Sequence, residues 1–80
     1  MYPKLINVKA TDDFKLFLNF STGENKIYDF KSDLDHPFYK ELRNITLFKN
    51  VKILDGEIEW ATGQDFCPHT LYENSVSIAM

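Results

Sequence analysis

The sequence predicts an α+β fold in which hairpins build an antiparallel sheet of about five strands, with two or three short helices packed on one face. Segments with the two-residue period of half-buried strands follow one another in runs, instead of alternating strictly with helical segments. Two short turns containing glycine, at residues 21–23 and 55–56, each join two segments whose apolar residues fall on the same face of an antiparallel hairpin. A chain of 80 residues is expected to form one domain over residues 1–80.

Three strands are predicted in the N-terminal part of the chain. Residues 5–10 form a short apolar segment, and residues 14–20 alternate between apolar and polar side chains, as half-buried strands do. A three-residue loop over residues 21–23 pairs Leu16 with Tyr28, which places both apolar sets on one face of the hairpin. The glycine of this loop is expected to have a positive φ, because a left-handed residue usually closes such a loop.

The middle of the chain is predicted to be helical. Pro37 favours the first position of a helix and biases the preceding residue away from helical geometry, which makes His36 the expected N-cap. Phe38, Leu42 and Ile45 are spaced four and three residues apart. At the period of an α-helix, these three side chains form one apolar stripe that faces the core.

A second hairpin over residues 51–60 has the clearest local signal in the sequence. Asp55-Gly56 separates two short apolar segments, and this dipeptide is typical of a two-residue type I′ turn. The resulting register pairs Val51 with Trp60 on one face of the hairpin. The register is further supported by opposite charges at Lys52 and Glu59, which it pairs on the other face.

Two further short helical turns and a terminal segment complete the predicted elements. Asn44 is a suitable cap for a short turn that follows the central helix. Pro68 indicates the start of another short helix, which ends near residues 74–75. Val76–Met80 is expected to be an extended tail.

Composition argues against several classes of function. The net charge is −3, the pI is about 5.2 and the nine basic residues are scattered, which does not support direct binding of nucleic acid. No apolar run approaches the roughly 20 residues of a membrane helix, so no membrane partner is expected. Cys67 is the only cysteine, and the N-terminus lacks the apolar region of a signal peptide, so we expect a cytoplasmic location.

The sequence contains no clear catalytic or metal-binding pattern. Cys67 and His69 are two residues apart, but a structural zinc site needs about four ligands, and a thiol enzyme needs a positioned base and an oxyanion hole. We therefore predict no catalytic residue, no metal site and no cofactor. Asp29 and Asp65 are candidate polar positions, either for local hydrogen bonds to backbone N–H groups or for binding a partner.

One face of the predicted sheet is a candidate contact surface. The register of the first hairpin places Phe17 opposite Ile27, on the face away from the core. Leu5 and Leu54 join this patch if their strands are neighbours in the sheet. Two interpretations stay open at this point: a helix covers the face, or the face binds another protein or a second copy of the chain.

An ordered set of residues resembles the family known as domain of unknown function 2442. The resemblance covers nearly the whole chain and rests on Tyr28-Asp29-Phe30, Leu47-Phe48 with Val51, Trp60, Gly63, Asp65, Pro68 and Leu71-Tyr72. It implies a small α+β domain, usually freestanding. Relatives are in some cases fused to a helix-turn-helix domain, and many belong to two-gene pairs that resemble toxin–antitoxin modules.

The expected function follows from these observations together. The resemblance provides no catalytic residues, and this chain has Cys67 and His69 where relatives often have acidic residues around Pro68. The first hypothesis is a non-enzymatic protein-interaction module, in the antitoxin-like role of a two-gene pair with a toxin-like partner. The alternative is a transcriptional or nucleic-acid-associated regulator that acts within a complex.

Overall fold

Seven strands and four short helical segments occur in the computed structural model, which describes residues 3–78. The strands are β1 (Leu5–Ala10), β2 (Lys15–Phe20), β3 (Asn25–Asp29), β4 (Val51–Leu54), β5 (Glu57–Trp60), β6 (Asp65–Phe66) and β7 (Val76–Ser77). The helical segments are the 3-10 helices η1 (Lys31–Asp35) and η2 (Pro37–Arg43) and the α-helices α1 (Ile45–Phe48) and α2 (Pro68–Asn74).

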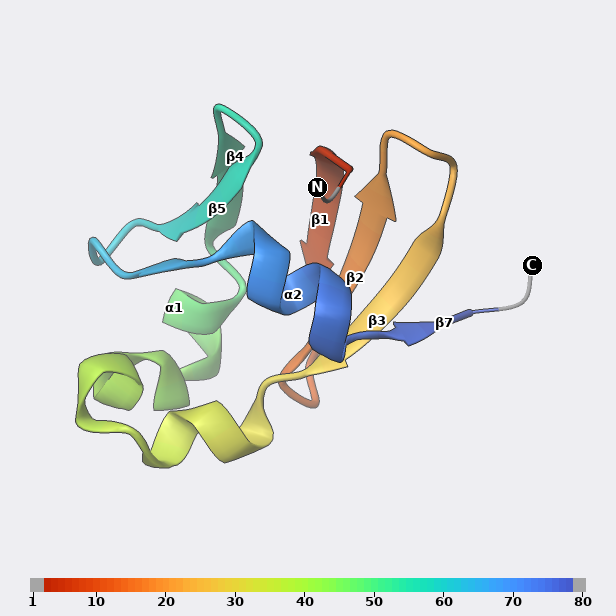
Figure 1. Ribbon diagram of the computed structural model, residues 1–80. Helices are drawn as coiled ribbons and strands as arrows, with labels where there is room; N and C mark the ends of the chain where they lie inside the picture. Colours follow the sequence, from red (N-terminus) through yellow and green to blue (C-terminus); the bar gives the residue numbers. More distant parts are fainter. Residues whose placement is uncertain (1–2, 79–80) are drawn as a thin grey trace.

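The strands form two antiparallel sheets, so the predicted single sheet of about five strands is wrong, while the α+β class is confirmed. The first sheet has the order β1-β2-β3-β7 and the second has the order β4-β5-β6. In Figure 1, β1, β2 and β3 run side by side with β7 beyond β3, and the β4–β5 hairpin lies beside β1 at the opposite edge. η1, η2 and α1 form the connection between the two sheets.

Aromatic packing explains why the second hairpin does not continue the first sheet. Phe30 and Trp60 are fully buried and their ring centroids are 5.2 Å apart, and the rings of Tyr28 and Phe66 are 5.5 Å apart. These pairs join residues of different sheets or their flanks. Because each large ring removes much apolar area from water, packing the two sheets around a shared core stabilises the fold more than extending one sheet edge to edge.

Both predicted hairpin registers are confirmed. In the first hairpin, Leu16 lies opposite Tyr28, and Gly23 has φ +90°. In the second, Val51 lies opposite Trp60, and both turn residues, Asp55 and Gly56, have the positive φ that a type I′ turn requires.

The strand predicted to begin at Phe14 begins one residue later. Phe14 has φ +61° and precedes β2. Its carbonyl still accepts a hydrogen bond from the Phe30 amide at 2.9 Å, so backbone bonding of the first hairpin extends to these two residues. The Phe14 ring packs against Phe48, with centroids 5.2 Å apart, and this contact accompanies the unusual backbone conformation.

The central helix begins at Pro37 as predicted, and the His36 ring accepts a hydrogen bond from the Phe38 amide at 3.1 Å. It is a 3-10 helix, which corrects the predicted apolar stripe. With three residues per turn, positions three apart share a face, so Tyr39 and Leu42 pack in the core. Phe38 is turned outward and is 50% exposed.

The C-terminal segment covers one face of the first sheet. Tyr72 of α2 packs edge-on against Phe20, with ring centroids 5.0 Å apart. Its carbonyl accepts a hydrogen bond from the buried Lys26 ammonium at 2.6 Å. Val76–Met80 was predicted to be an extended tail, and its first two residues instead form β7, which pairs with β3. Residues 79–80 lie outside the described residues.

Candidate functional site

The face of the first sheet opposite α2 is the candidate site. Side chains alternate between the two faces of a strand, and the inner set, which includes Leu16, Leu18 and Tyr28, is buried. The remaining positions point the other way. We define the outer face by the residues Asn7 and Lys9 of β1, Lys15, Phe17 and Asn19 of β2, Asn25, Ile27 and Asp29 of β3, and Val76 of β7.

Strand pairing arranges the outer face in three rows. The central row crosses all four strands in the order Lys9, Phe17, Ile27 and Val76, so three of its four members are apolar. Two large apolar side chains of this row are exposed to solvent: Phe17 is 42% exposed and Val76 is 66% exposed. A contiguous apolar row on a sheet surface is typical of a contact surface.

The two flanking rows are polar. One consists of three asparagines, Asn7, Asn19 and Asn25, and the amide of Asn19 donates a hydrogen bond to that of Asn25. The other pairs Lys15 with Asp29 across β2 and β3. An apolar centre between polar margins is the usual arrangement of a protein interface.

Two open clefts lie on this side of the molecule. The larger has a volume of about 470 Å³ and is lined by Lys15, Ile27, Tyr28, Asp29, Ser32, Asn74 and Val76. The smaller has a volume of about 360 Å³ and is lined by Lys9, Ala10, Thr11, Asp12, Phe17 and Lys49. Residues of the central row therefore line both clefts, with Ile27 and Val76 in one and Phe17 in the other.

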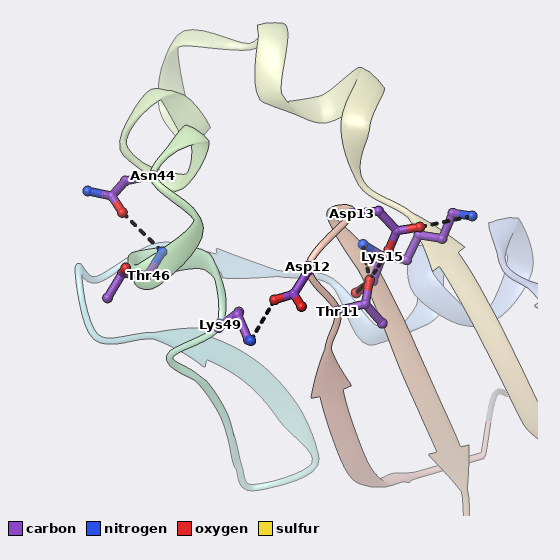
Figure 2. Close-up of polar contacts among 7 residues, drawn as sticks. All are labelled: Thr11, Asp12, Asp13, Lys15, Asn44, Thr46 and Lys49. Carbon is purple, nitrogen blue, oxygen red and sulfur yellow. Dashed lines mark hydrogen bonds and ion pairs between the residues drawn. The ribbon is translucent and has the colours of Figure 1, made fainter.

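Ion pairs hold the turn that follows β1 in place (Figure 2). Lys49, at the end of α1, reaches Asp12 with an N–O distance of 2.6 Å, and Lys15 reaches Asp13 with an N–O distance of 3.4 Å. The hydroxyl of Thr11 donates a hydrogen bond to Asp13, and this bond, together with Lys15, holds the pKa of the Asp13 carboxyl below its usual value. The lysines at this edge are thus engaged with carboxylates.

Two of the four residues predicted for the patch are not part of the outer face. Leu5 is 2% exposed, because the register of β1 shifts between residues 5 and 7 and directs Leu5 toward the core beside Phe20. Leu54 is 54% exposed but belongs to β4 of the second sheet, opposite Glu57. Phe17 and Ile27 are brought together as predicted.

The sequence prediction did not include Lys9 or Val76 in this surface. The predicted patch considered apolar residues only, so it left out Lys9, which the register of β1 places opposite Phe17. Val76 was assigned to a tail with no partner. The only local signal for β7 is the alternation of apolar and polar residues over Val76, Ser77 and Ile78, which is very short.

The candidate polar positions have different surroundings. The Asp29 carboxylate accepts a hydrogen bond from the Lys31 amide at 3.0 Å, which is a local bond of the expected kind. Asp65 is exposed in β6, and its backbone carbonyl accepts a hydrogen bond from the Tyr39 hydroxyl at 2.9 Å. The two carboxylates lie in different sheets and do not form one site.

Cys67 and His69 have simple local environments. Cys67 is exposed at the N-cap of α2, and the nearby backbone N–H groups of Thr70 and His69 hold the pKa of its thiol below the usual value. The Nε2 atom of His69 contacts the carboxylate of Glu73 one helical turn away. Within residues 3–78, no group of three or more His, Cys, Asp or Glu is placed to hold a metal ion.

The sequence matches one known protein family. Residues 5–77 match the family described as "Protein of unknown function (DUF2442)". The chain belongs to this family. The DUF2442 match confirms the resemblance inferred from the ordered residue set. Comparisons with curated proteins and with solved structures find no match. In the part of this DUF2442 chain that the structure describes, no helix is long and apolar enough to span a membrane.

Proposed function

We propose that this chain is a non-enzymatic, cytoplasmic protein-interaction domain whose binding surface is the outer face. The observation that supports the proposal is the central apolar row, in which Phe17, Ile27 and Val76 lie side by side on three strands. Leaving Phe17 and Val76 in water forgoes the stabilisation that burying them would give, about 1.5–3 kcal/mol for a fully buried large apolar side chain. Covering the row with a protein surface recovers part of that stabilisation.

The occupant belongs to one of two classes. One is a different protein, in the simplest case the toxin-like member of a two-gene pair, with this chain in the antitoxin-like role. The other is a second copy of this chain. The alternative role, in a complex that regulates transcription or binds nucleic acid, has less support. The reason is that Lys15 and Lys49, at the edge of the surface, are already paired with Asp13 and Asp12.

Tagged protein isolated from the cells that naturally produce it tests the proposal. Phe17→Ser removes the central aromatic side chain and is expected to weaken binding by about 2 kcal/mol, roughly 30-fold. Leu54→Ser is the matched control, since Leu54 is similarly exposed but lies on the other sheet. Proteins retained by the wild type, including untagged copies of the chain, should be retained by Leu54→Ser and lost with Phe17→Ser.

Folding is monitored in parallel by far-UV circular dichroism and thermal unfolding. The variant Phe17→Ser should unfold within a few degrees of the wild type, because surface substitutions usually change stability by about 0.5 kcal/mol or less. Identical sets of retained proteins for a folded Phe17→Ser and the wild type would disprove the assignment of the outer face.

A further inference from the structure

The outer face has an internal two-fold pattern. Consider a line that runs parallel to the strands, midway between β2 and β3. Across this line, cross-strand pairing places apolar Phe17 beside apolar Ile27, and cationic Lys15 beside anionic Asp29. The third pair consists of two asparagines, which are both donors and acceptors. Each of these six residues therefore has its physical complement directly across the line.

Such a pattern makes the face complementary to itself. A two-fold axis along this line, in the plane between two copies, lays each of these six residues over its cross-strand partner in the other copy, and it lays Lys9 over Val76 of the other copy. Phe17 then meets Ile27 of the second copy, and Lys15 meets Asp29 of the second copy. Both contacts occur twice by symmetry, and two sheets packed face to face with nearly aligned strands is a common arrangement.

The alternative two-fold axis, along the central row and across the strands, is unfavourable. It stacks Lys9 on Lys9 of the second copy, and it lays the asparagine row over the row of Lys15 and Asp29. Like charges placed directly opposite repel, and the charged groups lose their complementary partners. The distribution of side chains thus selects the axis parallel to the strands.

The larger cleft fits this arrangement. Ile27 and Val76 form its apolar lining, and Lys15 and Asp29 lie at the same cleft. With the selected axis, the exposed Phe17 ring of one copy lies over Ile27 of the other and enters this cleft. An aromatic side chain that fills a pocket at the centre of an interface is the usual anchor of binding.

Net charge presents only a small obstacle to a second copy at this position. The whole chain has a net charge of −3, so two copies repel each other when they approach at random. On the outer face, however, the charged residues are Lys9, Lys15 and Asp29, two positive and one negative, which sum to +1. The face therefore has a small net charge, so repulsion between two copies of it is weak.

We propose that the outer face is the self-association surface of a two-fold symmetric homodimer, with Phe17 of each copy in the cleft at Ile27 and Val76 of the other. This inference rests on the proposed function and names the occupant as a second copy. Lys15 exchanges its contact with Asp13 for the partner's carboxylate, while the Asp29 carboxylate keeps the Lys31 amide on Oδ1.

A charge-exchange experiment with the purified chain tests this geometry. The molecular mass is measured by sedimentation equilibrium over a range of protein concentrations. Lys15→Asp alone and Asp29→Lys alone each place like charges opposite one another twice per dimer, and each is expected to raise the Kd at least about tenfold. An equimolar mixture of these two variants is expected to form heterodimers with a Kd within about threefold of the wild type.

The mixture separates the interface from effects inside one chain. Lys15 and Asp29 are also neighbours within each protomer, so a single substitution changes that pair as well. Mixing two variants does not repair a pair inside a chain and restores only contacts between chains. Phe17→Ser should remove the dimer, and Leu54→Ser should leave its Kd unchanged.

Four outcomes would overturn the inference, and they distinguish its failure from failure of the proposed function. A wild-type chain that stays monomeric to its solubility limit disproves the homodimer, but capture of another protein through Phe17 would leave the proposed function intact. A dimer that the mixture does not restore, or one that survives Phe17→Ser, disproves this interface. A monomeric wild type whose captured proteins do not depend on Phe17 disproves both.

Discussion

Replacing Trp60 by phenylalanine tests the account of the shared core. Trp60 is fully buried, and its ring centroid lies 5.2 Å from that of Phe30 and 6.1 Å from that of Phe48. Its indole N–H donates a hydrogen bond to the Phe48 carbonyl at 2.8 Å. Trp60 thus joins β5 of the second sheet to the end of α1 and to the residue that follows β3.

The cost of Trp60→Phe has two parts. Leaving the buried Phe48 carbonyl without its donor costs about 1–3 kcal/mol. The smaller ring leaves a cavity that costs about 1 kcal/mol more, at about 24 cal/mol per Å³. A total of about 3 kcal/mol is a quarter or more of the stability of a domain this size, which is about 4–12 kcal/mol at about 0.05–0.15 kcal/mol per residue.

Thermal unfolding followed by far-UV circular dichroism measures this loss. At about 4–8 °C per kcal/mol, the expected fall in Tm for Trp60→Phe is about 12–24 °C. Leu54→Ala, at an exposed position of the same hairpin, is the control and should change the free energy of unfolding by about 0.5 kcal/mol or less. A fall of less than about 5 °C for Trp60→Phe would refute the view that this residue joins the two sheets.

Three further predictions concern single residues. Gly23→Ala should lower the free energy of unfolding, measured by urea titration, by about 1–2 kcal/mol, because the φ of +90° is unfavourable for a residue with a Cβ. An added Cβ would meet nothing within 4 Å, so steric contact adds no further cost. A larger loss would show that the backbone conformation is not the cause. Asn44→Ala should cost about 1 kcal/mol, because the Asn44 side chain accepts a hydrogen bond from the Thr46 amide at 3.0 Å, and Asn44→Asp should recover most of the loss (Figure 2). Burial, followed by the hydrogen bond to Asp33, raises the pKa of the Tyr28 hydroxyl, so the folded state keeps a proton that the unfolded state loses near pH 10. Stability should therefore be retained below about pH 10 and fall above it, and urea unfolding at about pH 8 and about pH 11 should show a smaller fall for Tyr28→Phe; an equal fall in both proteins would contradict this role of Tyr28.

The outer face shows how the prediction of a site depends on the prediction of a fold. The pair Phe17 and Ile27 was found from sequence because both residues belong to one hairpin with a short loop, and parity alone relates them. Leu5 and Leu54 were assigned to the same face on the assumption of one continuous sheet. The two-sheet arrangement and the irregularity in β1 place one in the core and the other on a different sheet.

The helical connection provides a second example. Pro37 and His36 predict where the helix begins, because proline geometry and N-cap hydrogen bonding are properties of neighbouring residues. Whether the segment forms an α-helix, with side chains of one face about four residues apart, or a 3-10 helix, with side chains three residues apart, is not decided by neighbouring residues. The 3-10 period places Tyr39 against Phe30, with ring centroids 5.1 Å apart, and leaves Phe38 in solvent.

The sequence by itself determined the α+β class, the family, both hairpin registers and the starts of the helices at Pro37 and Pro68. These features depend on contacts between residues that are close along the chain, where turn chemistry and the two-residue strand period act directly. Tertiary structure decided the division into two sheets, the inward turn of Leu5 and the existence of β6 and β7. Strands of two residues have almost no pattern of their own, and they form because distant parts of the chain present an edge on which their backbone groups find hydrogen-bond partners.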